Sequence, residues 1–282
     1  MIQAHDLLME ATRKLMAISA IPEWEHELLD KAPPVLWFGD AASEKPKILS
    51  FGANPSRWEF LDERGIKKAS LQKQEYESRY LSEEKRRFFH LDAAQRWQDI
   101  LHNTALRTQI INSFNQYFKS GNAYRWFGAN KYDSYNAEGL LRGMNASYFD
   151  TETSFRALHI DLFPFTTIRD FGSIRGITER DVLSGFWARD LVYEIINMLQ
   201  PKRLLVFGAG NLNYFCAYFG ADAGPAEHWK SQGAGALGSC RVHRFQHEQI
   251  PVTGLSVNLG NPKGFNAQGL RELGEYLSGN AV

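Results

Sequence analysis

Residues 50–56 read SFGANPS and follow directly on the apolar residues KIL at 47–49. A short apolar run that ends at Gly and Pro is typical of a buried strand followed by a rigid turn. The turn presents one amide side chain, Asn54, at the C-terminal end of that strand. Open α/β folds bind their ligands at this edge of the sheet, so the stretch indicates both a fold class and the position of a site.

Four apolar segments read as core strands of this kind. They are KILSFG at 47–52, ALHIDLF at 157–163, RLLVFGA at 203–209 and GLSVNLG at 254–260. Helical patterns separate them, at about 66–87, 92–118 and 178–200 and in NLNYFCAYFG after the third segment. Strands that are apolar throughout are typical of parallel sheets covered on both faces. We therefore expect an α/β fold, a three-layer sandwich with a central, mostly parallel four-stranded sheet, to which CRVHRF at 240–245 adds an edge strand.

The length of the chain and the absence of a linker indicate a single domain. The chain has 282 residues, and no Pro-, Ser- or Gly-rich stretch divides it, so we expect one domain over 1–282 with a long helical insertion at about 57–150. No apolar run reaches membrane-spanning length. The first stretch, MIQAHDLLMEATRKLM, mixes charges into an apolar pattern of helical spacing. We expect an amphipathic helix there rather than a signal peptide, no membrane contact and a cytoplasmic location.

The net charge, together with the number and spacing of Cys and His residues, indicates which partners and metals the protein can bind. Thirty-two Lys and Arg balance 32 Asp and Glu, so the net charge does not favour nucleic acid, although local basic clusters leave that partner open. Two cysteines are too few for a disulfide framework or a four-cysteine zinc site, and His243 and His247 fall in an alternating strand pattern that separates them. Asn213 stands where a dinucleotide-binding turn starting at Gly208 needs its third glycine. We expect no metal and no cofactor.

Three loops follow predicted strands and carry the polar residues of a candidate site. They are GANPS at 52–56, DLFPFTT at 161–167 and GNPKGFN at 260–266. Because the carboxyl ends of parallel strands meet at one edge of a sheet, we expect these loops to converge on one pocket.

The three loops together resemble motifs of the uracil-DNA glycosylase superfamily. Gly52-Ala53-Asn54-Pro55 is similar to the family's first motif, Gly-x-Asp/Asn-Pro, and Asn261-Pro262-Lys263 to its last, His/Asn-Pro-Ser. HIDLFPF falls where the family has a strand that ends in a base-reading residue. NPKGFN looks most like the last loop of the mismatch-specific uracil/thymine branch. The resemblance runs from about residue 35 to 275, and it implies a monofunctional DNA glycosylase that flips a base out of the helix and leaves an abasic site.

The resemblance also implies roles for the catalytic residues. Asn54 would position the water that captures the sugar cation, since an amide orients a water but is not a strong base. Asn261 would stabilise the charge that develops on the departing base, and the turn residues Gly52 and Ala53 would line the base pocket. The alternative for Asn54 is that it stabilises its own turn, which Asn commonly does.

Asp161 departs from the family, which often has Asn at this position. An ionised carboxylate only accepts hydrogen bonds, and the N4 amino group of cytosine is a natural donor to it. Ser56 stands where uracil-specific relatives have a Tyr that blocks C5 substituents, so that side of the base would be open. These two residues favour a C5-modified cytosine, as found in phage DNA, over uracil. The alternative for Asp161 is a residue that caps the turn after its strand.

The last loop and the aromatic residues would contact the duplex. Lys263 would reach a flanking phosphate, Gly264 would allow the backbone to approach DNA, and Phe265 would enter the gap left by the flipped base. Phe89 is our candidate for the ring that stacks on the base. Phe88, Trp126 and Phe127 are further aromatic candidates for this role.

The sequence thus predicts a DNA glycosylase that excises hydroxymethylcytosine or its glucosylated form from phage DNA as an antiviral defence. DNA is the expected partner, and no obligate protein partner is evident. Two alternatives stay open: a uracil/thymine mismatch glycosylase of DNA repair, and a catalytically inactive nucleic-acid-binding member of the fold.

Overall fold

A computed structural model describes residues 2–24, 26–63, 76, 78–128, 134–149, 152–169 and 188–279. The chain divides into two compact units. The first comprises Met1–Phe38, Ala53–Asn122 and Asp161–Met198, and the second comprises Gly39–Gly52, Ala123–Ile160 and Leu199–Val282. The expected insertion at 57–150 is divided between them. A single domain over 1–282 stays a prediction.

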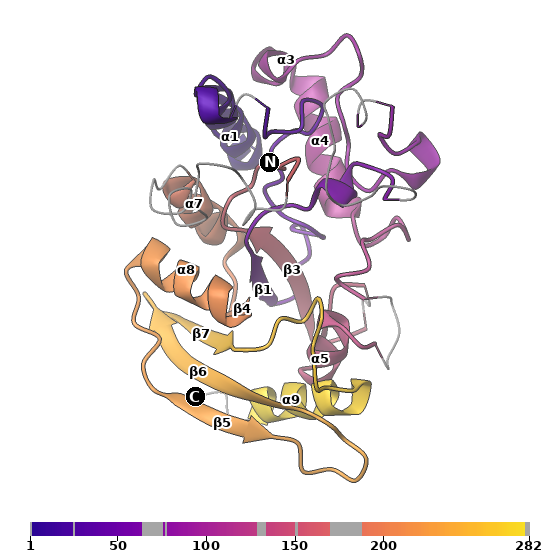
Figure 1. The fold of residues 1–282 in the computed structure, drawn as a ribbon. Coiled ribbons are helices and arrows are strands. Elements are labelled where there is room, and N and C mark those ends of the chain that lie inside the picture. Colours follow the sequence, from indigo (N-terminus) through magenta and orange to yellow (C-terminus); the bar gives the residue numbers. More distant parts are fainter. Residues whose placement is uncertain are drawn as a thin grey trace. The chain divides into compact units, whose positions relative to one another are not determined.

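The second unit is built on a seven-stranded mixed sheet (Figure 1). In spatial order its strands are β2 (Ala146–Ser147), β3 (Phe155–Asp161), β1 (Lys47–Gly52), β4 (Arg203–Phe207), β7 (Ile250–Leu255), β6 (Ser239–His247) and β5 (Ala226–Lys230). The pairs β2/β3, β1/β4 and β4/β7 are parallel, whereas β7/β6 and β6/β5 are antiparallel. The expected α/β class with a mostly parallel sheet is confirmed, but the sheet is larger than the four strands predicted.

The central strands form because their side chains are apolar on both faces. In β1 every residue after Lys47 is buried, and in β4 every residue after Arg203 is buried. The register sets Leu49 opposite Leu204 and Phe51 opposite Val206, so that branched and aromatic side chains pack in rows across the sheet.

The strand predicted at 254–260 is displaced: β7 ends at Leu255, and the residues that follow form a turn. The side-chain oxygen of Asn258 accepts a hydrogen bond from the Gly260 amide at 2.9 Å, and an Asn that bonds backbone two residues on favours a turn over a strand. The strand predicted at 240–245 exists within β6, but β5 pairs with its outer side, so it is not an edge. β5 was missed because AEHWK is mostly exposed and polar.

The first unit is helical. It contains α1 (Ile2–Ser19), α3 (Trp97–His102), α4 (Thr104–Gln116) and α7 (Arg189–Leu199, whose last residue belongs to the second unit), with short 3₁₀ turns η1 (Pro22–Trp24), η2 (Arg57–Glu59) and η3 (Glu83–Lys85). The helix predicted at 92–118 is two helices, because the Asn103 side chain caps α4 by accepting from the Leu106 amide at 3.0 Å.

The other helix predictions are tested only in part. Half of the helix predicted at 66–87 lies outside the described residues, and the described stretch 78–87 holds only the turn η3. For the prediction at 178–200, residues 178–187 lie outside and α7 accounts for the rest. None of the helices described here has the length and apolar character needed to span a membrane.

The helices of the second unit are α5 (Ala137–Gly143), α8 (Ala209–Phe219) and α9 (Ala267–Gly279). α5 and α9 lie side by side (Figure 1). Gly274 of α9 faces Gly143 of α5. A Cβ atom on Gly274 would come 2.9 Å from the Cα atom of Gly143 and would also collide with the carbonyl oxygen of Leu140. The two backbones therefore touch without any intervening side chain.

We expect Gly274→Ala to lower the free energy of unfolding by about 1–3 kcal/mol, because the added methyl group meets backbone that cannot move aside cheaply. Chemical denaturation followed by far-ultraviolet circular dichroism measures the change. The matched control is Gly279→Ala at the end of the same helix, where an added Cβ has no atom within 4 Å. If both variants have the same stability, close packing between these helices is not what requires Gly274.

Candidate active site

The loops that carry Asn54 and Asp161 leave neighbouring strands at the same end. The Arg156 amide donates to the Pro46 carbonyl at 3.0 Å, and further along the Phe163 amide donates to the Ala53 carbonyl at 2.9 Å. The second bond joins residues that lie further along the chain on both strands, so β1 and β3 run parallel. The last of these bonds, within the first unit, brings the backbone at Ala53 beside the segment that begins at Asp161.

The amide of Asn54 is held in one orientation. Its Nδ2 atom donates to the Thr167 hydroxyl oxygen at 3.0 Å, and the Thr167 hydroxyl donates its hydrogen to the Arg169 carbonyl at 2.7 Å. Since that hydrogen is engaged, the Thr167 oxygen can only accept from Asn54, which fixes which end of the amide faces it. The Asn54 side-chain oxygen is left with no hydrogen-bond partner among the described residues, and it is available to accept from a water.

Glu59 is a candidate site residue that sequence reasoning missed. It ends η2, five residues after Asn54, and is only 3 % exposed. The Tyr117 hydroxyl donates to its Oε2 atom at 2.7 Å. Burial is the main cause that raises the pKa of Glu59 to about 8; the Tyr117 hydrogen bond and the charge of Arg87 act against it, and the charge of Asp161 adds a smaller upward effect. Glu59 is therefore a neutral acid at pH 7, close enough to Asp161 for the two carboxyl groups to interact.

Buried contacts hold η2 against the segment that follows β3. The Arg57 guanidinium, itself buried, donates to the Ile168 carbonyl and lies 4.6 Å from the centre of the Trp58 ring. Asp161 is 3 % exposed at the end of β3, and Phe163 packs on Trp24 with ring centres 5.4 Å apart. The site therefore rests on side chains that are fixed by packing.

Ser56 caps η2. Its hydroxyl oxygen accepts from the Trp58 amide at 3.3 Å, and the residue is half-buried. A Ser at the start of a helical turn commonly has this role. The open side at C5 of the base, which the sequence predicts from Ser56, stays a prediction.

The loop of Asn261 belongs to the second unit and is exposed at its tip. The Asn261 amide donates to the Asn258 carbonyl at 3.1 Å, and the Tyr135 hydroxyl donates to the Pro262 carbonyl at 2.8 Å. Asn261, Lys263 and Gly264 are all exposed. Gly264 has a φ of 82°, which favours glycine, and an added Cβ would meet no atom within 4 Å.

The structure corrects the prediction for Phe265. Its side chain is 5 % exposed and stacks on Trp229, with ring centres 6.0 Å apart and planes 6° apart. Gly238 leaves room for the ring, since a Cβ there would collide with it. Although Phe265 directly follows the exposed Gly264, its ring is buried against Trp229. Phe265 is therefore a core residue and not an exposed wedge.

The four aromatic candidates for the stacking ring differ in how deeply they are buried. Phe88 and Phe127 are buried in the core. Phe89 is half-buried, with the Arg86 guanidinium 5.8 Å from its ring centre. Trp126 is half-buried in the second unit and packs on Gly260, where an added Cβ would collide with the indole. Trp126 is thus the candidate ring that the structure places against the loop of Asn261.

The predicted residues therefore form two sets. Asn54, Asp161 and the added Glu59 belong to the first unit, whereas Asn261 and Trp126 belong to the second. The meeting of these sets around one base stays a prediction. Among the residues that the structure describes, no group of three or more His, Cys, Asp or Glu side chains is arranged to hold a metal ion.

Comparison of the chain with protein-family models, with curated proteins and with solved structures finds no match to any of them.

The raised pKa of Glu59 predicts how stability depends on pH. The folded protein keeps a proton on Glu59 that the unfolded chain loses at about pH 4.5, so the free energy of unfolding falls as pH rises from there to about 8. Glu59→Gln should remove this component and make the curve flatter over that range. Urea titrations of both proteins at a series of pH values measure it, and parallel curves for the two proteins would contradict the assignment.

Proposed function

We propose that this protein is a DNA glycosylase that flips out and excises a C5-modified cytosine, with the three-layer fold and chemistry of the uracil-DNA glycosylase superfamily. The observation that supports the proposal best is the grouping of three polar residues at two neighbouring parallel strands: the oriented amide Asn54 and the neutral acid Glu59 on the segment after β1, and Asp161 at the end of β3. This edge of an α/β sheet is where ligands bind.

Base recognition would fall to the two carboxyl groups. The ionised Asp161 would accept a hydrogen bond from the N4 amino group of the flipped cytosine. Glu59 would donate its proton to N3, since a neutral carboxylic acid in an apolar site is a hydrogen-bond donor. Protonation at N3 makes cytosine a better leaving group, because the electrons of the broken bond then arrive on a base that has already gained a positive charge.

Bond cleavage would proceed through a sugar cation. The bond between C1′ and N1 breaks, its electron pair stays with the protonated base, and the base leaves as neutral cytosine. The oxygen of Asn54, held by Thr167, accepts a hydrogen bond from a water and directs it at C1′. The water gives its oxygen to C1′ and returns one proton to Glu59, which leaves an abasic site and restores the enzyme.

The second unit would supply contacts to the base and to DNA. In this proposal Asn261 donates to the departing base, Trp126 replaces Phe89 as the stacking ring, and Lys263 contacts a phosphate beside the exposed turn at Gly264. A C5-modified cytosine of phage DNA is the favoured substrate, since removal of plain cytosine would damage the cell's own genome. The protein would then act in antiviral defence.

Duplexes that each carry one cytosine, hydroxymethylcytosine, glucosylated hydroxymethylcytosine, uracil or G·T mismatch test the proposal. After incubation, alkali cleaves abasic sites, and labelled strands are separated by size. We expect product from a modified cytosine and none from plain cytosine. Product from uracil or G·T alone would favour the repair alternative. Retained DNA binding with no product from any duplex would favour the inactive binding member.

Asp161→Asn tests the base assignment within the same assay. An amide both donates and accepts, so the variant should lose activity on modified cytosine by about 100-fold and gain activity on uracil. Thr153→Asn is the matched control, since Thr153 lies before β3 in the second unit. An unchanged preference in Asp161→Asn, with the fold intact by circular dichroism, would contradict recognition of the base by Asp161.

A further inference from the structure

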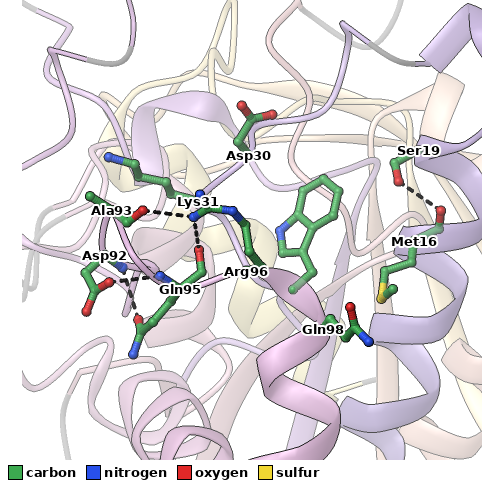
Figure 2. Close-up of a pocket in the computed structure, with 10 residues that line it drawn as sticks. Met16, Ser19, Asp30, Lys31, Asp92, Ala93, Gln95, Arg96 and Gln98 are labelled. Carbon is green, nitrogen blue, oxygen red and sulfur yellow. Dashed lines mark hydrogen bonds between the residues drawn. The ribbon is translucent and has the colours of Figure 1, made fainter.

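The first unit contains a hollow that the proposed chemistry does not use. Its volume is about 740 Å³, within the range typical of small-molecule sites. Three segments surround it: the end of α1 with Met16 and Ser19, the loop at Asp30 and Lys31, and the stretch 92–98 that leads into α3. Figure 2 shows Met16 and Ser19 across the hollow from Asp92 and Gln95.

The frame of this hollow is held by hydrogen bonds. The indole Nε1 of Trp97 donates to the Ala32 carbonyl at 3.0 Å, and the Leu91 amide donates to the Lys31 carbonyl at 2.9 Å. The Lys31 amide donates in turn to the Tyr80 hydroxyl at 3.1 Å. Trp97 is half-buried, so part of its ring stays open to the hollow. A ring fixed in this way offers a flat apolar surface at little cost in conformational entropy.

The cations of the hollow are already engaged elsewhere. Arg96 donates from one nitrogen to the carbonyls of Ala93 and Gln95, both at 2.8 Å, which draws its guanidinium back along its own turn (Figure 2). The Lys31 ammonium lies 5.0 Å from the centre of the Tyr80 ring. Since the two carboxylates, Asp30 and Asp92, balance these cations, the lining has no net charge to attract a phosphate or another anion.

The other polar side chains can still bond hydroxyl groups. The Asp92 carboxylate already accepts from the backbone amides of Ala94 and Gln95, and the Gln95 side-chain oxygen accepts from the Asp92 amide. A carboxylate has room to accept further hydrogen bonds, and the side-chain amides of Gln95 and Gln98 can donate them. The exposed Gln98 amide has no hydrogen-bond partner within the described chain. A sugar ring has the matching properties, because its hydroxyls donate and accept around the rim while its C–H face is apolar and packs on an indole.

We propose that this hollow is a carbohydrate site that binds a neutral saccharide, with Trp97 as the platform under the sugar ring and Gln98 and Asp30 as partners of its hydroxyls. The volume exceeds what a single hexose fills, so a disaccharide or a hexose attached to a larger group fits the space. The proposal stands independently of the glycosylase activity.

Fluorine NMR of the full chain labelled with 5-fluorotryptophan tests the proposal. The chain has seven Trp, and Trp97→Phe identifies the Trp97 resonance by its loss. Methyl glucoside, methyl galactoside, methyl mannoside and maltose are titrated separately, with adenosine monophosphate as an anionic ring compound. We expect at least one saccharide to shift the Trp97 resonance in a saturable manner. No shift with any saccharide, or a shift with the nucleotide alone, would overturn the proposal.

Side-chain variants then test the hydroxyl partners. Gln98→Ala should weaken the affinity for the saccharide by up to about tenfold, the effect of losing one hydrogen bond to the ligand. Gln3→Ala, an exposed Gln at the start of α1, is the matched control and should leave the affinity unchanged. Equal affinities in the two variants would mean that Gln98 does not contact the ligand and would remove it from the proposed site.

Discussion

Burial of the Glu59 carboxyl group determines its protonation state, because an ionised carboxylate is costly to bury unless charges or several hydrogen bonds compensate for it. Tyr117 supplies one hydrogen bond and Arg87 a favourable charge, but burial outweighs both, and the charge of Asp161 opposes ionisation. By keeping Glu59 protonated, the folded chain avoids the cost of burying an ionised carboxylate. An apolar residue at this position would serve a stable core as well, and this is why the proposed function assigns the acid a chemical role.

Two kinds of polar side chain lie on the segments after β1 and at the end of β3: the amide of Asn54 and the carboxyl groups of Glu59 and Asp161. Asn54 is oriented through Thr167, and its side-chain oxygen has no partner among the residues that the structure describes, which suits a water. Burial raises the pKa of Glu59, whose carboxyl group interacts with that of Asp161, and neighbouring carboxyl groups in different environments are a common basis for acid and base roles. Both features sit on short segments after β1 and β3 that packing holds rigid. These polar groups therefore lie on neighbouring segments at one edge of the sheet, and the proposed function assigns that edge to the ligand.

The sequence predicted those parts of the fold that local pattern determines. β1 and β4 are apolar throughout and bounded by charge and glycine, and the turn at Asn54 follows from Gly52 and Pro55. Contacts between distant residues could not be predicted in this way. Glu59 lies in an ordinary polar stretch, and its burial depends on Tyr117, 58 residues away. Phe265 follows an exposed glycine but folds onto Trp229, and the end of β7 depends on a turn made by Asn258.

The protonation state of Glu59 tests the central claim most directly. Carbon NMR of the chain labelled with ¹³C at the Glu carboxyl groups follows each group through a pH titration, and Glu59→Gln identifies the resonance by its loss. The account predicts a carboxyl that keeps its proton at neutral pH and titrates near 8, the value expected from its burial. A Glu59 resonance that titrates in the ordinary range of exposed glutamates would contradict the account, because no neutral acid would then stand beside Asp161.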